Sequence, residues 1–316
     1  MTFSVVIPAH NSGAFLKEAL ESVRAQTFQD FEVIIVDDAS IDDTWQVVQS
    51  CQHWFSGRCR SLRIEPPRNE GPAGARNLAL GQAQGESVAF LDSDDLWVPE
   101  HLARAQKCFR AHGDKVGLFA GPGQIIGTKR LLHEFQWPDP EPQPASPQLL
   151  QQCYFPLPSV CVRRSLLDEV GGFCAELVCH EDWLLYLLLS KRTLFMHSPE
   201  VECLIRRRPE SVTRSRKRMS KPMYRDWVKA YLTVERSQMW SNVELRTMRE
   251  GFIQDRAGEL ADYLCAFDVG RAAWSTSGLV ASGLRGQKVW RPILWLGFCE
   301  FLCRGLRKVG RSLRAK

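Results

Sequence analysis

The sequence lacks any cysteine pair of the C-x-x-C type and any cysteine spacing typical of zinc sites. Its eleven cysteines are an odd number in 316 residues, and several of them lie inside apolar runs. Scattered cysteines of this kind are typical of reduced, buried thiols in a cytosolic protein. A disulfide framework is therefore not expected.

Long hydrophobic runs are missing as well. The longest apolar stretch late in the chain, Pro292–Cys303, is interrupted by Glu300 and is too short to span a bilayer. The opening residues MTFSVVIPAHN have no basic leader and no apolar segment of signal-peptide length. We therefore expect a cytoplasmic protein that is not secreted.

The composition that remains is that of an ordinary globular protein, with 44% hydrophobic and 24% charged residues. The net charge of +5 is unevenly distributed, because residues 284–316 hold nine Lys or Arg and a single Glu. The rest of the chain therefore carries a net charge of about −3. A basic tail on a mildly acidic body favours an anionic surface as partner and argues against nucleic acid.

Strand and helix patterns alternate over the first hundred residues. Short apolar runs predict strands at 3–9, 31–40, 61–67 and 87–95, and helical spacing predicts helices at 11–26, 42–54, 71–85 and 99–112. Asn11 or Ser12 is a suitable cap for the first helix. Continuous apolar strands between helices predict an α/β fold, with a mostly parallel sheet covered by helices on both faces.

The later part of the chain follows a looser pattern. Five prolines within residues 137–148 predict a loop or lid. Further expected elements are a strand at 116–127, a strand and short helix at 159–173, an apolar helix at 180–192 and one final strand at 194–208. From about Met219 onward the pattern is helical and amphipathic, and no internal repeat is present.

Polar residues follow three of the predicted strands at the points where they end. These exits are residues 8–11, residues 37–40 and the acidic run Asp92-Ser93-Asp94-Asp95. In parallel α/β sheets, ligands bind beyond the carboxyl ends of the strands, so all three exits should face one crevice.

The acidic run is costly without a partner, because like charges a few ångströms apart repel by about 1 kcal/mol even in water. A divalent cation removes that penalty, and oxygen ligands suit Mg²⁺ or Mn²⁺. Mg²⁺ usually takes one or two carboxylates together with substrate phosphates. The run therefore predicts half of a metal site completed by a diphosphate. The alternative is a turn in which Asp95 merely caps the segment before Pro99.

Three segments together resemble one family. They read SVVIPAHNSGAFLKEALESVRAQTFQDFEVIIVDDASIDDT, NEGPAGARNLAL and GESVAFLDSDDLWVP. They resemble the family 2 glycosyltransferases of the GT-A fold, which use nucleotide-diphosphate sugars. The resemblance is strong over residues 3–110, fair at CHEDWLLYLLL and RRRPESVTR, and absent beyond about residue 220.

The resemblance implies a nucleotide-sugar site. The residues expected to line the nucleotide pocket are Pro8, Ala9, His10 and Asn11, with no chemistry assigned to His10. Asp38 resembles the acid that binds the nucleobase, and Arg76 the basic residue that closes the base side of the pocket. The alternatives are that Asp38 caps the helix at 42–54 and that Arg76 is a surface residue paired with Glu70.

The same resemblance assigns the acids. Asp92-Ser93-Asp94 matches the D-x-D motif; Asp94 would contact the ribose or the metal, and Asp94 or Asp95 would hold the cation. Asp182 resembles the general base of an inverting displacement, with Glu181 orienting the acceptor or the helix start. The alternative for both is an ordinary acidic helix cap.

Arg208 departs from the family pattern, because related enzymes often carry a His there that helps to hold the metal or diphosphate. Arginine cannot ligate a metal, but it can pair with phosphate in a bidentate manner. A phosphate role for Arg208 and a solvated basic loop both stay open. Trp183 is either an acceptor platform or, more simply, a core residue.

The implied organisation is a GT-A catalytic domain at 1–218 and a helical extension at 219–316. The nucleotide-binding half would span about 1–115 and the acceptor half about 116–218. The implied enzyme moves a sugar, most commonly from a UDP-sugar, to a carbohydrate, lipid-linked or protein acceptor in cell-surface glycan or glycoconjugate synthesis.

The tail at 284–316 mixes Trp, Leu and Phe with basic residues, as interfacial helices do. It would dock on the anionic inner face of the cell membrane, or else pack on the catalytic domain or form a homodimer. Rival interpretations are an inactive sugar-nucleotide-binding protein, a retaining glycosyltransferase or nucleotidyltransferase, and a receiver domain. The receiver domain is disfavoured because its acidic pair should close the first strand.

Overall fold

The computed structural model describes residues 2–132, 141–144, 147–150, 153–208 and 220–250. The chain divides into two compact units, one of residues 1–149 and 153–209 and the other of residues 150–152 and 210–316. The predicted boundary at residue 218, half of the proline-rich segment 137–148 and the basic tail at 284–316 lie outside the described residues. They stay predictions.

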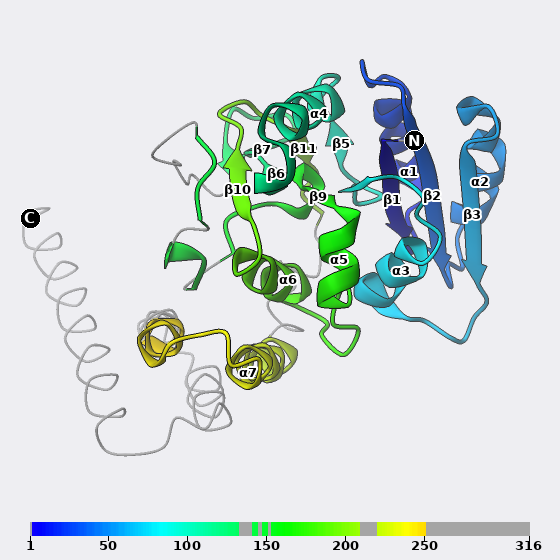
Figure 1. The fold of residues 1–316 in the computed structure, drawn as a ribbon. Helices are drawn as coiled ribbons and strands as arrows, with labels where there is room; N and C mark the ends of the chain where they lie inside the picture. The colour runs from blue at the N-terminus through cyan, green and yellow to red at the C-terminus, as the bar shows by residue number, and fades with distance from the viewer. Residues whose placement is uncertain (1, 133–140, 145–146, 151–152, 209–219, 251–316) are drawn as a thin grey trace, which may run out of the picture. The chain divides into compact units, whose positions relative to one another are not determined.

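The first unit is built on a seven-stranded sheet in the order β10-β6-β9-β4-β1-β2-β3 (Figure 1). Its strands are β1 (Phe3–Ala9), β2 (Phe31–Asp38), β3 (Cys59–Ile64), β4 (Ser87–Phe90), β6 (Val116–Ala120), β9 (Cys161–Arg163) and β10 (Leu194–His197). Neighbouring strands run parallel except at β9, which is antiparallel to both β4 and β6. The predicted mostly parallel α/β sheet is thus confirmed.

The helices of this unit are α1 (Gly13–Arg24), α2 (Thr44–Cys51), α3 (Gly71–Leu80), α4 (His101–His112), α5 (Arg164–Val170) and α6 (Glu181–Ser190). Short 3₁₀ turns occupy Gln52–Phe55, Gly113–Lys115, Pro147–Leu150 and Leu157–Ser159. Ser12 precedes α1 as predicted, but its hydroxyl donates to the His10 carbonyl oxygen instead of capping the helix.

The centre of the sheet is buried on both faces, which explains its continuous apolar strands. Every residue of β1 and β2 is buried. Leu16, Leu20 and Val23 lie on the inner side of α1 at helical spacing and join the odd-numbered residues of β1 in one core. Helix α3 also packs against β1 and β2. Because these strands are packed on both faces, the positions of their carboxyl ends are fixed.

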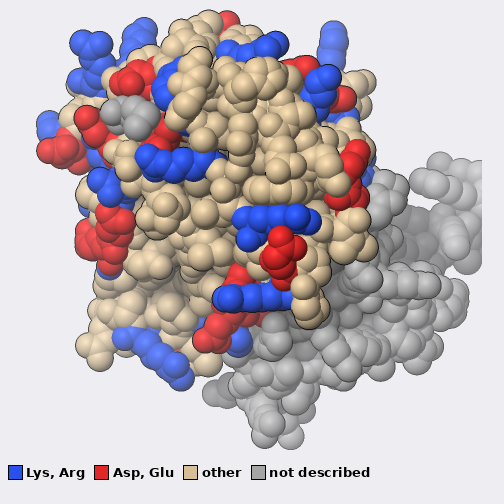
Figure 2. All heavy atoms as spheres, turned by 90° about the vertical axis from the view of Figure 1, so that its right-hand side faces the viewer, with Lys and Arg blue, Asp and Glu red and all other residues tan. Residues whose placement is uncertain are grey.

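Strand β3 forms an open edge of the sheet, and arginines protect it. Arg58 donates to the Phe31 carbonyl oxygen, Arg60 pairs with Glu32 and Arg63 with Asp37. Figure 2 faces the side of the molecule on which β3 and α2 lie, and basic and acidic side chains are interspersed there around an uncharged centre. Charged edge strands disfavour pairing with another chain.

A second sheet has four strands in the order β5-β11-β7-β8. Its first strand along the chain, β5, directly follows the acidic run that ends at Asp95. It consists of β5 (Leu96–Trp97), β7 (Gly123–Ile125), β8 (Leu131–Leu132) and β11 (Cys203–Ile205). The prediction of one strand over 194–208 was wrong. The segment forms β10 in the large sheet and β11 in the small one, because Ser198-Pro199 turns the chain between them. Residues 116–127 divide in the same way at Gly121-Pro122.

In the second unit, α7 (Ser220–Arg236) is helical, as the amphipathic pattern predicted. Trp227 and Tyr231 stack one turn apart with ring centroids 5.4 Å apart, and Ala230 and Val234 are buried. Among the residues that the structure describes, no helix is both long enough and apolar enough to cross a membrane.

Candidate active site

Three strand exits meet at one edge of the large sheet, as the sequence predicted. β1 and β2 run parallel, with Ala9 opposite Asp37, and β4 lies on the other side of β1. The exits touch directly, because Asn11 N–H donates to Ser40 Oγ at 2.9 Å and Ser93 Oγ–H donates to Ser12 Oγ at 2.8 Å.

The predicted nucleotide-pocket residues differ in their accessibility. Pro8 and Ala9 are buried as the last residues of β1, whereas His10 and Asn11 are exposed beyond it. Asn11 and Ala39 both have left-handed backbones, with φ of 47° and 59°. Such conformations cost non-glycine residues about 1–2 kcal/mol and concentrate at functional sites. The two strained turns therefore mark this edge as a candidate ligand site.

Asp38 organises the loop before α3. Its Oδ1 accepts the Glu70 N–H at 2.8 Å, and its carbonyl oxygen accepts Asn69 Nδ2–H at 3.1 Å. Asp38 therefore does not cap α2, where Asp42 accepts the Thr44 N–H instead. Binding of a nucleobase by Asp38 stays a prediction.

Burial and neighbouring negative charge raise the pKa of two acids at the β4 exit, Asp94 and Asp95. Burial and then the charge of Asp92 raise the pKa of Asp94, and burial followed by Asp92 and Asp94 raises that of Asp95 well above its ordinary value. Burial is the larger cause, and the like-charge repulsion that the sequence predicted adds to it.

Two arginines after β11 oppose that negative charge. The Arg206 N–H donates to Asp95 Oδ1 at 2.7 Å, and Arg206 Nε donates to the Asp94 carbonyl oxygen at 3.0 Å. Arg208 Nε lies 2.7 Å from Asp94 Oδ2. Arg208 thus lies beside the acidic run, and its phosphate role stays a prediction. The contacts of Arg206 were missed. Its only signal was its place in an arginine run.

The two predicted metal ligands are not equivalent. The Asp94 side chain is 17% exposed, whereas Asp95 is 5% exposed and has Oδ1 committed to the Arg206 backbone. The described part of the chain contains no group of three or more His, Cys, Asp or Glu side chains placed around a metal position. A single carboxylate with a diphosphate is nevertheless a common Mg²⁺ environment, and Asp94 fits it.

Arg76 links the two acidic motifs, which lie far apart in the sequence. Its Nη2 donates to Asp92 Oδ1 at 2.7 Å and its Nη1 to Glu181 Oε1 at 3.1 Å, with the side chain only 5% exposed. The guanidinium also lies over the Phe173 ring. Arg76 is therefore not a surface residue paired with Glu70. Its predicted contact with the base stays untested, because this structure commits the side chain to the two acids.

Glu181 and Asp182 form the first turn of α6. Burial raises the pKa of Glu181 to about 7, with the charge of Asp182 adding to the rise and Arg76 opposing it. Burial also raises the pKa of Asp182, which the Trp183 N–H bond opposes. Two adjacent acids with raised pKa values titrate together, so the pair can hold a proton near neutral pH.

The surroundings of Asp182 leave it partly open. Its Oδ1 accepts the Trp183 N–H at 2.7 Å, and the Cys153 thiol lies 3.8 Å from Oδ2. Asp182 keeps some exposure, whereas Trp183 is buried and donates from Nε1 to the Leu149 carbonyl oxygen. Trp183 is thus a core residue, and the role of Asp182 as the base stays a prediction.

Comparison with known proteins assigns the chain to a family. The model of glycosyl transferase family 2 matches residues 4–171, which is more than half of the chain. An uncharacterized glycosyltransferase of Nostoc sp. is 31% identical over 175 residues, which cover 54% of this chain and 53% of the relative.

An Escherichia coli protein named UDP-Glc:alpha-D-GlcNAc-diphosphoundecaprenol beta-1,3-glucosyltransferase WfaP is 34% identical over 136 residues, covering 39% of this chain and 52% of the relative. The chain thus spans about half the length of each of these two relatives. The solved structure of S. aureus TarS 1-349 in complex with UDP-GlcNAc shares the fold, with a TM-score of 0.75 and 21% identity over 100% of this chain and 92% of that one. On the match to the family model, supported by the shared fold, the chain belongs to glycosyl transferase family 2, with the GT-A fold.

Proposed function

We propose that this chain transfers a sugar from a nucleotide-diphosphate sugar to an acceptor hydroxyl, with inversion at the anomeric carbon. One observation carries the proposal: the guanidinium of Arg76 binds both Asp92 at the β4 exit and Glu181 at the start of α6. A donor site and a candidate base are thereby brought together from segments some ninety residues apart.

The donor's nucleoside would lie over the exits of β1 and β2, between Asp38 and the turn at His10-Asn11. The names of the relatives favour uridine, because UDP-Glc is in the name of the E. coli protein and UDP-GlcNAc is bound in the TarS structure. The diphosphate would then reach the β4 exit, where Asp94 and Arg208 lie.

Asp94 is the residue that would hold Mg²⁺ or Mn²⁺, with Asp95 supporting it. When bound, the cation supplies positive charge to the diphosphate. Arg208 would supply further charge to the same phosphates by charge-assisted hydrogen bonds. It would exchange its Asp94 contact for phosphate oxygens as the donor binds.

Asp182 would act as the base. The acceptor hydroxyl gives its proton to Asp182 as its oxygen forms a bond to the anomeric carbon. The bond from that carbon to the diphosphate oxygen breaks, and the electron pair leaves with the nucleoside diphosphate. A base with a raised pKa holds the transferred proton more readily than an ordinary carboxylate. Glu181, held by Arg76, would fix the start of α6 and thus the position of Asp182.

The acceptor that we propose is taken from the name of one relative, and the proposed location follows from that acceptor. The E. coli protein is named for a diphosphoundecaprenol-linked acceptor, so we propose a cell-envelope glycan acceptor met at the inner face of the membrane. The extension at 219–316 would bring the enzyme there through its basic tail. Homodimer formation through the tail is the competing proposal.

The test combines binding and turnover. The wild type should bind UDP by calorimetry with Mn²⁺ present, and a panel of UDP-sugars should reveal one that is hydrolysed slowly. Asp182→Asn should keep UDP affinity within about twofold and lose about 10²–10⁴-fold in turnover. The buried Asp226→Asn, in the second unit, controls for loss of a carboxylate.

Full activity of Asp182→Asn would reject Asp182 as base. UDP binding by the wild type without turnover on any donor would favour the inactive binding protein. An anomeric configuration retained in the product, read by NMR, would reject inversion.

A further inference from the structure

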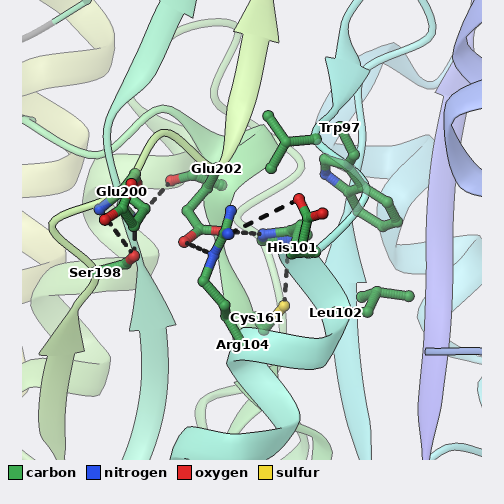
Figure 3. Close-up of polar contacts among 12 residues, drawn as sticks. Trp97, His101, Leu102, Arg104, Cys161, Ser198, Glu200 and Glu202 are labelled. Atoms are coloured by element: carbon green, nitrogen blue, oxygen red, sulfur yellow. Dashed lines mark hydrogen bonds and ion pairs between the residues drawn. The ribbon is translucent and has the colours of Figure 1, made fainter. Parts of the chain in front are cut away.

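A buried polar cluster lies in the first unit and takes no part in the site described so far. It joins His101 at the start of α4, Cys161 in β9 and Glu202 just before β11 (Figure 3). His101 Nδ1 lies 2.9 Å from Glu202 Oε2, Arg104 Nε donates to Glu202 Oε1 at 2.8 Å, and the Cys161 sulfur lies 3.4 Å from His101 Nε2.

The cluster has the groups of a Cys–His–Glu triad, but its burial excludes nucleophilic catalysis. His101, Cys161 and Glu202 are each 0% exposed, so no substrate reaches the sulfur. Burial also raises the pKa of the Cys161 thiol, which keeps it protonated. A buried carboxylate held by two donors must therefore serve another purpose, since buried charge is costly to retain.

Glu202 is fixed at its backbone as well as its side chain. Its N–H donates to the Pro122 carbonyl oxygen at 2.9 Å, and its carbonyl oxygen accepts the Val98 N–H at 3.3 Å. Gly121 packs so closely that an added Cβ would lie 2.4 Å from Glu202 Cγ. The start of β11 is thus held in one position.

The other end of β11 reaches the acids of the candidate active site. β11 pairs antiparallel with β5 through only two residue pairs, Cys203 with Trp97 and Leu204 with Leu96. β5 begins directly after Asp95, so this register brings Arg206 to Asp94 and Asp95. On its other side β11 pairs in parallel with β7 through three residue pairs, Cys203 with Gly123, Leu204 with Gln124 and Ile205 with Ile125. Both ladders are short, and the contacts of Glu202 add an anchor at the start of β11.

We propose that Glu202, held by His101 and Arg104, is a positioning residue that sets β11 so that Arg206 and Arg208 meet Asp94 and the donor diphosphate. The inference rests on the proposed function, because it takes the ligand of Arg208 to be a diphosphate. Glu202 touches no substrate and acts only through the six residues that follow it, 203–208.

The experiment compares UDP with uridine, because only UDP presents phosphates to Arg208. The protein is the full chain with Mn²⁺ present, and the readouts are calorimetry for UDP and ligand-observed NMR for uridine. Glu202→Gln keeps the side chain's volume but replaces one carboxylate oxygen by an NH₂ group. It therefore cannot accept hydrogen bonds from both Arg104 and His101, which contact different oxygens of Glu202. It should weaken UDP binding about tenfold or more and leave uridine binding within twofold.

Two further variants guard against loss of folding. Arg104→Ala removes one donor at a side chain that is partly exposed, and Gly121→Ala displaces Glu202 without changing its charge. Both variants should weaken the binding of UDP more than the binding of uridine. The matched controls are Arg60→Ala and Glu32→Gln, an arginine and a buried glutamate that form an ion pair on β3 and β2 of the large sheet. Their ratio of UDP to uridine affinity should equal that of the wild type.

The outcomes separate the two proposals. A wild type that binds no UDP overturns the proposed function. Suppose that the wild type binds UDP, and that Arg104→Ala and Gly121→Ala weaken the binding of UDP and of uridine equally or leave both unchanged. That result overturns only the positioning role. If Arg60→Ala and Glu32→Gln lost as much UDP affinity relative to uridine as Glu202→Gln, the positioning role would also be overturned. The loss would then reflect reduced stability in general.

Discussion

The raised pKa of Glu181 predicts a pH-dependent stability that a single substitution can isolate. The folded pKa of about 7 lies above the ordinary value of 4.5, because the side chain is buried and lies beside Asp182. A raised carboxyl pKa contributes stability that is fully present below pH 4.5 and is lost as the pH rises through 7. Glu181→Gln imitates the protonated side chain at every pH, so it should escape this loss.

The magnitude follows from the two pKa values. Between pH 5 and pH 8 the shift from 4.5 to about 7 is worth about 2–3 kcal/mol. Relative to the wild type, Glu181→Gln should therefore gain about 2–3 kcal/mol in free energy of unfolding between these two pH values. The side chain is only 12% exposed, so solvent screening is limited.

Urea denaturation of both proteins at half-unit steps of pH measures this difference, and the comparison cancels the titration of the groups that do not interact with Glu181. Glu169→Gln, at an exposed ion pair with Arg192, reports what loss of a surface carboxylate does to the same comparison. A difference between Glu181→Gln and wild type that stays constant from pH 5 to pH 8 would refute the raised pKa, and with it the view that Glu181 and Asp182 share a proton near neutrality.

Three further predictions test the site and its frame. Arg76→Met should cost about 3–5 kcal/mol in urea denaturation at pH 8, because it leaves the largely buried Glu181 and the partly exposed Asp92 without their cation. The more exposed Arg60→Met should cost about 1 kcal/mol or less, and similar costs for the two variants would contradict the bridge. Gly85→Ala should cost about 1–3 kcal/mol in thermal or urea unfolding, because its Cβ would lie 2.5 Å from the Ser4 nitrogen, and Gly81→Ala, which meets only ordinary contacts, should be neutral or stabilising. Arg208→Ala should weaken UDP binding about 10–100-fold by calorimetry, with Arg164→Ala as the exposed control; an unchanged affinity would remove Arg208 from the diphosphate site.

The Arg76 bridge shows where sequence reasoning stopped. The family resemblance placed Arg76 at the base side of the pocket, and the alternative was a surface residue paired with Glu70. Arg76 instead lies on the buried face of α3. Its partners lie just after β4 and on α6, and no spacing along the chain connects them. The pairing exists only because α3 and α6 both begin near the carboxyl end of the sheet.

The division of residues 194–208 is a second case. The run is apolar enough at both ends to suggest one strand, and Ser198-Pro199 interrupts it only briefly. The two halves enter different sheets because each finds a different partner, β6 for the first and β5 with β7 for the second. That change of sheet is what delivers Arg206 and Arg208 to the acids.

The sequence by itself determined the alternation of strands and helices, the three polar strand exits and the pair of acids at the start of α6. These are local properties, because side-chain periodicity and turn chemistry act over a few residues. The tertiary structure alone decided that Arg76 joins the two acidic motifs, that Asp94 is more open than Asp95, and that a sealed His101–Glu202 pair anchors β11. These contacts span from sixteen to more than a hundred residues of chain, and only the packing of the sheet brings such partners within hydrogen-bond distance.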